Sequence, residues 1–178
     1  LYSLAGALPS GTRLISHRPF RSPHHTVSPQ GLTGGGAVPK PGEISLAHNG
    51  VLFMDEFPEF DRRTKESLRQ PLEDGVITIS RAGGSLTYPS NIMVVAAMNP
   101  CPCGFLGHPT KDCTCSQAAV NRYRDKVSGP ILDRMDQHVE VLSGDYDELA
   151  DTTRGEPLRG SRQRVNRARQ MQARRFAG

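Results

Sequence analysis

The sequence predicts an α/β fold in which a mainly parallel sheet is flanked by helices. Two short apolar runs, residues 51–54 and 92–98, have the length and composition of strands buried on both faces of a parallel sheet. Helix-like stretches separate them, and this alternation is typical of the α/β class. The chain has 178 residues, enough for one domain with its own hydrophobic core.

The composition favours a folded domain with long irregular connections. Hydrophobic residues make up 36% of the chain, and there are 18 glycines and 14 prolines. No apolar run approaches the ~20 residues that a membrane span requires, and no stretch has the regions of a signal peptide. We therefore expect a soluble, cytoplasmic protein without membrane contact. Because the chain begins at Leu1, we expect it to be a piece of a longer protein.

The first part of the chain is predicted to be mostly irregular. Residues 1–8 resemble the end of a helix that Pro9 stops, and residues 13–20 could hold a short strand. Residues 21–42 are rich in Gly, Pro, Ser and Thr, which predicts a long loop. Long loops inside compact domains are usually functional or mobile.

A helix and a hairpin are predicted between the two apolar runs. Asp61 is a suitable N-cap for a helix that extends to residue 73. Pro71 lies inside this helix and should kink or tighten it, because an interior proline costs ~3 kcal/mol. Two strand-like runs follow, at residues 76–80 and 85–88. A glycine-containing turn at residues 82–84 connects them into a hairpin.

Shorter elements are predicted in the last third of the chain. Residues 117–126 and 130–135 are helix-like, and residues 138–141 have the composition of a last strand. The stretch after Gly144 has the composition of a linker. Ser161 could cap a final helix with apolar residues along one side, at Val165, Ala168, Met171 and Phe176.

Two acids, Asp55 and Glu56, follow the first apolar run directly. Ligands of open α/β sheets bind at the carboxyl ends of the strands. There, one acid can hold a Mg²⁺ that bridges nucleotide phosphates, and a second can orient and deprotonate a water molecule. The pattern thus matches a Walker B motif, with Asp55 for the metal and Glu56 for the water. An ordinary strand that ends in a solvated acidic turn is the alternative.

The second apolar run also ends in a polar residue, Asn99. Asn99 could hydrogen-bond the attacking water or the γ-phosphate, as a sensor 1 residue does. Its alternative role is to form a turn before Pro100. Two neighbouring strands that deliver polar groups to one sheet edge favour the catalytic interpretation.

Four cysteines, Cys101, Cys103, Cys113 and Cys115, form the pattern C-x-C-x9-C-x-C. In a cytosolic chain such a cluster suggests a metal rather than disulfides. Four thiolates could bind Zn²⁺ tetrahedrally and stabilise a loop with little apolar content. Asp112 or His108 could replace one cysteine, and four reduced thiols without metal are the alternative.

Several motifs in this order resemble a known family. The order strand-Asp-Glu, helix, hairpin, strand-Asn and helix, followed by GPILDRMD at residues 129–136, resembles the AAA+ ATPases of the magnesium chelatase group. The motifs RPFRSPHHT at residues 18–26 and NPCPCG at residues 99–104 are similar to the bacterial ComM/YifB family. The resemblance covers nearly the whole chain.

The resemblance implies an AAA+ P-loop-type core over residues 1–142, with a pre-sensor 1 β-hairpin insertion at residues 76–88. Residues 143–160 would be a linker and residues 161–178 the start of a helical lid. It also implies an ATP- and Mg²⁺-dependent motor that works as a ring, a hexamer in this family. Its partner would be DNA, which it would remodel by branch migration during natural transformation.

The resemblance also gives Arg134 a role, as the arginine finger that contacts the γ-phosphate bound by a neighbouring subunit. Such a residue stabilises charge in the transition state, by ~10³- to 10⁵-fold in rate. The alternative for Arg134 is a surface ion pair with Asp133 or Asp136, which would contribute little.

One departure from the family pattern concerns phosphate binding. The sequence contains no G-x-x-x-x-G-K-[ST] motif, and the resemblance places this Walker A loop before the segment that matches residues 1–8. The family's sensor 2 arginine would lie beyond Gly178. We therefore expect the isolated chain not to hydrolyse ATP.

Two rival functions remain open at the level of the sequence. One is a magnesium chelatase ATPase subunit, against which the cysteine loop and residues 18–26 argue. The other is a non-catalytic, zinc-stapled module that binds nucleic acid through its basic end, where residues 154–175 hold eight arginines and one acid. The same arginines could form a solvated helix face, and the tip of the hairpin could either touch DNA or be a structural turn.

Overall fold

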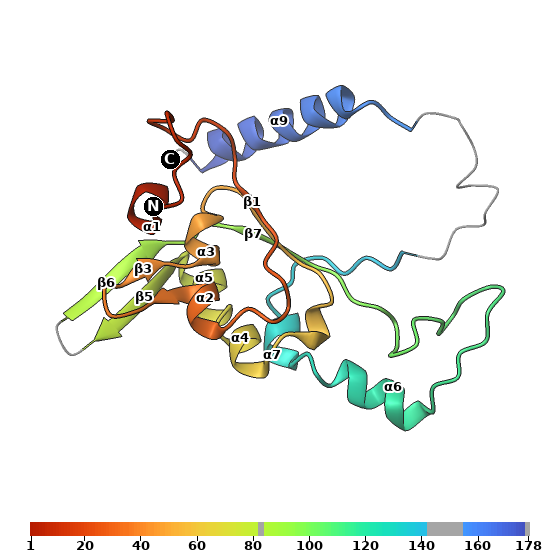
Figure 1. Cartoon of the computed structure of the whole chain (residues 1–178). Coiled ribbons are helices and arrows are strands. Elements are labelled where there is room, and N and C mark those ends of the chain that lie inside the picture. The colour runs from red at the N-terminus through yellow and green to blue at the C-terminus, as the bar shows by residue number, and fades with distance from the viewer. Residues whose placement is uncertain (82–83, 142–154, 177–178) are drawn as a thin grey trace. The chain divides into compact units, whose positions relative to one another are not determined.

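A computed structural model of the chain describes residues 1–81, 84–141 and 155–176. It contains two compact units, Leu1–Glu140 and Val141–Gly178. The first unit has a mixed α/β fold with a parallel sheet and flanking helices, as predicted (Figure 1). No helix in the described part of the chain is long and apolar enough to cross a membrane.

The parallel sheet has three strands in the order β1-β4-β7, so β4 is central. Strand β4, Val51–Met54, pairs in parallel with β1, Phe20–Arg21, and with β7, Met93–Ala96. The prediction of a strand over residues 13–20 was therefore wrong except at its last residue. The carboxyl ends of β4 and β7 lie side by side, because Met54 is the partner of Ala96.

The two apolar runs differ in burial. In β4, Leu52 and Met54 are fully buried, and the other two side chains are partly buried. In β7, however, Met93 is 54% exposed and Val95 41% exposed. The prediction that residues 92–98 are buried on both faces was therefore wrong. Strand β7 lies at the sheet edge, and no described element covers these two side chains.

The predicted loop over residues 21–42 in fact contains secondary structure. Ser28 caps helix α2, Pro29–Thr33, through a hydrogen bond from the Gly31 amide, and a proline begins this helix. Gly34 and Gly42 then let two backbone segments approach closely, because a Cβ on Gly42 would lie 2.3 Å from the Gly34 nitrogen. The elements around this crossing are β2, Gly34–Gly35, β3, Lys40–Pro41, and α3, Glu43–Leu46.

The predicted helix over residues 61–73 is broken, as Pro71 suggested. It forms α4, Arg62–Glu66, and α5, Arg69–Asp74. A proline at position 71 cannot donate to the carbonyl of Ser67, which is where the first helix ends. Asp61 caps α4 as predicted, since its Oδ1 accepts a 2.8 Å hydrogen bond from the Arg63 amide. Gly75, with a φ of 65°, ends α5.

The predicted hairpin is confirmed as an antiparallel pair. Strand β5, Val76–Arg81, pairs with β6, Gly84–Pro89. Its buried side chains join the main core, and the Tyr88 hydroxyl donates to the carbonyl of Pro39 at 2.9 Å. The tip of the hairpin, for which both DNA contact and a purely structural role were open, falls on residues 82–83, outside the described residues.

The core of the first unit is formed by side chains from α2, α3, β4, the turn after it, the hairpin and the segment around α7. The buried members are Leu32, Ile44, Ala47, Leu52, Met54, Phe57, Phe60, Leu68, Ile77, Ile79, Tyr88, Val127 and Ile131. Because these residues surround the end of β4, the core holds the acidic turn in place.

The remaining elements of the first unit are helical. The predicted helices form as α6, Gln117–Arg124, and α7, Gly129–Leu132, while residues 1–8 form only a short α1, Tyr2–Ala5. The strand predicted over residues 138–141 was wrong. Val139 is 79% exposed and pairs with no strand among the described residues.

The second unit contains one described helix, α9, Leu158–Arg175. It begins before Ser161, so the predicted N-cap at that residue was wrong. Ser161 lies inside the helix, where its hydroxyl donates to Glu156 at 3.3 Å. All arginines of α9 are exposed. Most of the predicted linker falls on residues 142–154, which lie outside the described part, and the domain boundaries stay predictions.

Candidate functional site

Asp55 and Glu56 form a sharp turn immediately after the central strand β4. Both side chains are exposed, and Asp55 Oδ1 accepts a 2.9 Å hydrogen bond from the Glu56 amide. Glu56 has a φ of 51° and ψ of 43°, in the left-handed region. Non-glycine residues there cost on the order of 1 kcal/mol and persist where surrounding structure fixes them, often at functional sites.

Four hydrogen bonds fix this turn. The Phe57 amide donates to the carbonyl of Ala97 at 2.9 Å, and the Ala97 amide donates to the carbonyl of Met54 at the same distance. The buried Lys65 ammonium donates to the carbonyl of Pro58, inside the short helix η1, Phe57–Glu59, and to that of Phe60, directly after it. Burial lowers the pKa of Lys65. The acidic turn is therefore tied both to the end of β7 and to α4.

An open pocket of about 380 Å³ lies beside the acidic turn. Its walls come from the turn after β4, the segment after β7 and helix α6. The lining residues are Glu56, Glu59, Asn99, Pro102, Ala119, Arg122, Tyr123 and Lys126. The structure thus brings Glu56 and Asn99 together, as the sequence predicted. Neither Asp55, the residue before Glu56, nor Arg134 is among the lining residues.

The pocket has two cations on α6 or just after it. Lys126 pairs with Glu59 at 2.9 Å and lies 5.5 Å from the centre of the Tyr123 ring. Arg122, in contrast, has no hydrogen-bond or ion-pair partner within the described parts of the chain. Among the described residues, one positive side chain of the pocket therefore has no direct partner.

Tyr123 on α6 lies close to residues of the other two walls of the pocket. Burial raises the pKa of Tyr123, and a backbone hydrogen bond with Asn99 opposes this rise. The charges of Glu59, Cys101 and Glu56 raise the pKa further. Tyr123 therefore lies within electrostatic reach of the acidic turn, Asn99 and the first cysteine.

His25 is a site residue that the sequence did not single out. Its Nδ1 lies 2.8 Å from Glu56 Oε2. Neighbouring side chains of an extended chain point to opposite faces, but the rings of His24 and His25 lie together, with centres 4.1 Å apart. The chain turns here, with the Val27 amide donating to the carbonyl of His24, and an extended geometry does not apply. The only available signal was the location of His25 in the 18–26 motif.

Arg134 is held by partners other than those considered. Its Nη1 donates to the carbonyl of Pro130 at 2.6 Å, and its Nη2 pairs with Glu73 on α5. Neither Asp133 nor Asp136 is its partner, so the ion pair proposed as its alternative role involves a different acid. The Arg134 side chain is 28% exposed.

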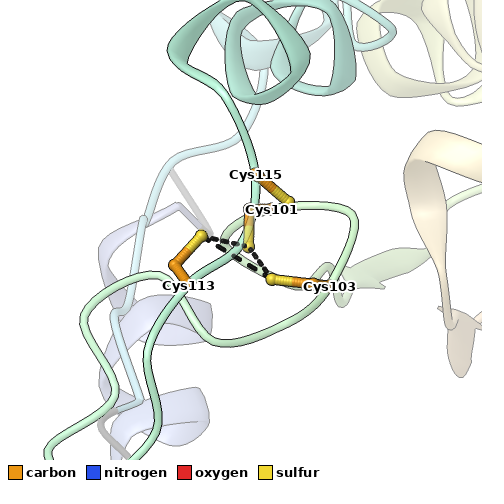
Figure 2. A group of neighbouring side chains, drawn as sticks. All are labelled: Cys101, Cys103, Cys113 and Cys115. Carbon is orange, nitrogen blue, oxygen red and sulfur yellow. Dashed lines mark hydrogen bonds between the residues drawn. The ribbon is translucent and has the colours of Figure 1, made fainter.

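The four cysteines gather into one cluster after β7 (Figure 2). Their sulfur atoms all lie within 4.8 Å of one another, and the three pairs among Cys101, Cys103 and Cys113 are 3.4–3.7 Å apart. A tetrahedral Zn²⁺ site with bonds of about 2.3 Å has sulfur atoms about 3.8 Å apart, whereas a disulfide requires about 2.05 Å. The cluster therefore has the dimensions of a metal site.

The chemistry of the donor set also fits a metal. Among the described residues, the cluster consists of four cysteines, without the alternatives Asp112 and His108. A backbone hydrogen bond from Phe105 lowers the pKa of Cys103 to about 6. A backbone hydrogen bond with Cys115 lowers the pKa of Cys113, but burial and its thiol neighbours raise it to about 12. A bound cation favours the thiolate form of all such ligands.

The fold and the acidic turn together define the class of protein. A mixed α/β core has a parallel sheet flanked by helices, and its central strand ends in an Asp-Glu pair. This is an AAA+ type of core. The family model described as "Magnesium chelatase, subunit ChlI" matches residues 1–149. The chain belongs to the magnesium chelatase family, in the group that includes ComM and YifB.

Comparison with individual proteins separates this group from the chelatases. The chain is 49% identical over 159 residues to YifB of Escherichia coli (strain K12), which covers 89% of this chain. It is 49% identical over 157 residues to the competence protein ComM of Haemophilus influenzae, which covers 87%. The match to the magnesium-chelatase 67 kDa subunit of Heliobacterium mobile is 27% over 113 residues, covering 64% of this chain and 15% of that subunit. The chain spans about a third of the length of YifB and ComM, namely 31% and 30%.

Proposed function

We propose that the whole protein is an ATP-hydrolysing AAA+ motor and that this chain supplies the part that carries its hydrolytic groups. The observation that carries the proposal is that Glu56 and Asn99 line one pocket at the carboxyl ends of two paired parallel strands. Ligands bind at this edge in open α/β sheets. The phosphates themselves would be held by a Walker A loop before this chain.

Each proposed role follows from position and chemistry. Asp55 would hold Mg²⁺, since carboxylate oxygens suit this ion and its Oδ2 has no hydrogen-bond partner among the described residues. The ion, bound with ATP, neutralises phosphate charge. Glu56 would orient the attacking water and accept its proton, and the Asn99 amide would hydrogen-bond the water or the γ-phosphate. Arg134 would act on the site of a neighbouring subunit.

The motor would remodel DNA as a ring of subunits. The resemblance to the ComM/YifB family implies that this ring is a hexamer. Its support is the 49% identity to the competence protein ComM, against 27% to a magnesium-chelatase subunit. This difference disfavours the chelatase alternative. The exposed arginines of α9 could contact the phosphates of DNA. Because a non-catalytic binding module would use the same arginines, that module is the alternative function.

The hydrolytic roles are tested by substitutions in the whole protein. Glu56→Gln should retain ATP binding and lose turnover by about 10²- to 10⁴-fold, because the amide cannot accept a proton. Asp55→Ala should also weaken Mg²⁺-dependent binding. Asp125→Asn is the matched control, since Asp125 follows α6, is exposed and does not line the pocket. Titration calorimetry and phosphate release give the two readouts.

Two results would contradict this proposal in different ways. Wild-type turnover in Glu56→Gln would remove Glu56 from the hydrolytic step. Absence of turnover in the wild-type whole protein, with DNA binding intact, would favour the non-catalytic module.

We also propose that the four-cysteine cluster binds Zn²⁺ in a cytoplasmic protein. Four soft thiolates at tetrahedral spacing select Zn²⁺ over Mg²⁺, and reduced thiols persist in the cytoplasm. Protein purified without chelator should contain about one zinc per chain by elemental analysis. Metal-free protein whose NMR spectrum retains full native dispersion would overturn this assignment.

A further inference from the structure

The cysteine cluster and the candidate nucleotide pocket are built from one continuous segment. Asn99 and Pro102 line the pocket, and Cys101 lies between them in the sequence. At the other end of the segment, Cys115 directly precedes Ser116, the N-cap of α6, whose Oγ accepts a 3.3 Å hydrogen bond from the Ala119 amide. The four cysteines therefore lie in the loop that connects two walls of the pocket, namely the segment directly after β7 and helix α6.

Helix α6 presents one face to the pocket. Ala119, Arg122 and Tyr123 line it and are spaced three and four residues apart, as residues on the same side of a helix are. The direction of this helix, and so the location of Arg122, depends on how the segment before it is fixed.

Apolar burial contributes little to fixing this segment. Between residues 98 and 116, all of which the structure describes, Cys101 is the only buried residue, and there is no helix or strand. Ordering each residue of a chain costs conformational entropy. A loop of this composition needs another source of order, and the cysteine cluster is the feature that spans it.

We propose that a zinc ion held by Cys101, Cys103, Cys113 and Cys115 clamps this loop, and that the clamp positions α6 so that Arg122 contacts the phosphates of the bound nucleotide. The inference rests on the proposed ATPase function for the identity of the ligand. It adds a role for the cluster and a phosphate-binding residue that the sequence motifs do not supply.

Arg122 suits this role because its charge is not used elsewhere. Lys126, the other cation of the pocket, is paired with Glu59, whereas Arg122 has no partner in the described part of the chain. A guanidinium forms charge-assisted, bidentate hydrogen bonds with phosphate oxygens. The opposite wall carries Glu56, so a phosphate that contacts Arg122 lies in the same pocket as the proposed base.

The clamp is tested in the whole protein with Cys113→Ser, using Asp112→Ser as the adjacent non-ligand control. Cys113→Ser should lose zinc and show at least tenfold faster amide hydrogen exchange in α6 than the wild type. The Michaelis constant for ATP should rise about tenfold. Asp112→Ser should keep one zinc and wild-type exchange. If Cys113→Ser does not fold, chelation of the wild type followed by zinc addition replaces it, and both changes should reverse.

The contact of Arg122 is tested separately by Arg122→Ala and Arg122→Lys. Arg122→Ala should keep one zinc and wild-type exchange in α6, yet raise the Michaelis constant for ATP about tenfold, with Arg122→Lys intermediate. Arg124→Ala is the matched control, because Arg124 is exposed on the same helix and does not line the pocket. Equal effects of Arg122→Ala and Arg124→Ala would overturn the contact.

The outcomes separate this inference from the proposed function. Zinc loss that leaves α6 exchange and ATP turnover unchanged, in a protein that still depends on Glu56, overturns the clamp alone. Faster α6 exchange on zinc loss, in a protein without any ATP turnover, supports the clamp and overturns the ATPase proposal together with the Arg122 contact.

Discussion

The side chain of Glu56 is held by one neighbour from a distant part of the chain. His25 Nδ1 lies 2.8 Å from its carboxylate, while 57% of the Glu56 side chain is exposed. An exposed glutamate samples several rotamers, so a single close contact with an imidazole nitrogen can decide which of them dominates. We therefore propose that His25 positions the proposed base, and it lies in the motif at residues 18–26 that the sequence left without a role.

We expect His25→Ala to lower kcat of the whole protein about tenfold with little change in KM for ATP. The carboxylate would remain, but a smaller fraction of molecules would hold it in a productive orientation. His25→Gln, which retains a hydrogen-bond donor, should restore part of the loss. His24→Ala is the control, because His24 bonds to Thr26 rather than to Glu56. Equal kcat values for His25→Ala and wild type would show that Glu56 is positioned without this contact.

The proposed site residues differ in how far the sequence could predict them. Asp55, Glu56 and Asn99 follow apolar runs, and the parallel pairing of β4 with β7 makes the ends of those runs neighbours. His25 could not be found in this way, since it reaches Glu56 from a turn 31 positions earlier in the sequence. Only tertiary packing brings those segments together, and no local periodicity encodes it.

At the level of elements, local chemistry predicted helix ends better than strand environments. Asp61 acts through its own side chain on a nearby amide and Pro71 through its own backbone, so the cap and the break of the helical stretch appear where expected. The exposure of β7 depends on its place at the sheet edge, which composition does not reveal. The same reasoning explains residues 138–141, which have strand-like composition but no strand beside them in the described part.

The glycine content of the sequence did not predict where two backbone segments approach each other closely, as they do at Gly50. A Cβ on Gly50 would lie 1.9 Å from the carbonyl oxygen of Pro19, whose carbonyl accepts a hydrogen bond from the Val51 amide. A glycine is therefore required where β1 meets the start of β4. This contact brings the segment with His25 alongside the strand that carries Asp55 and Glu56, and so links a fold requirement to the candidate site.

At the scale of the whole molecule, the order of motifs was sufficient to identify the family. The match of residues 1–149 to the magnesium chelatase model confirms that identification. The ring and the DNA partner depend on contacts between molecules, which neither strand patterns nor this single chain contains. They stay proposals, and the residue that bears on them most directly is Arg134.

Arg134 is expected to complete the active site of a neighbouring subunit. It does not line the pocket that contains Glu56, and its guanidinium is held at the surface by Glu73 and the carbonyl of Pro130. A whole protein with Arg134→Ala should bind ATP and hydrolyse it at least 10³-fold more slowly, because an arginine finger acts on transition-state charge. The Glu56→Gln protein should be equally inactive for a different reason.

Mixing the two inactive proteins tests whether the site is shared. Some interfaces of a mixed ring would pair an intact Glu56 with an intact Arg134, so phosphate release should return to a fraction of the wild-type rate. A mixture of Arg134→Ala with a protein carrying both substitutions is the control, since none of its interfaces contains an intact Arg134. Lack of recovery under conditions where labelled subunits demonstrably exchange would show that Arg134 acts within its own subunit or has only a structural role.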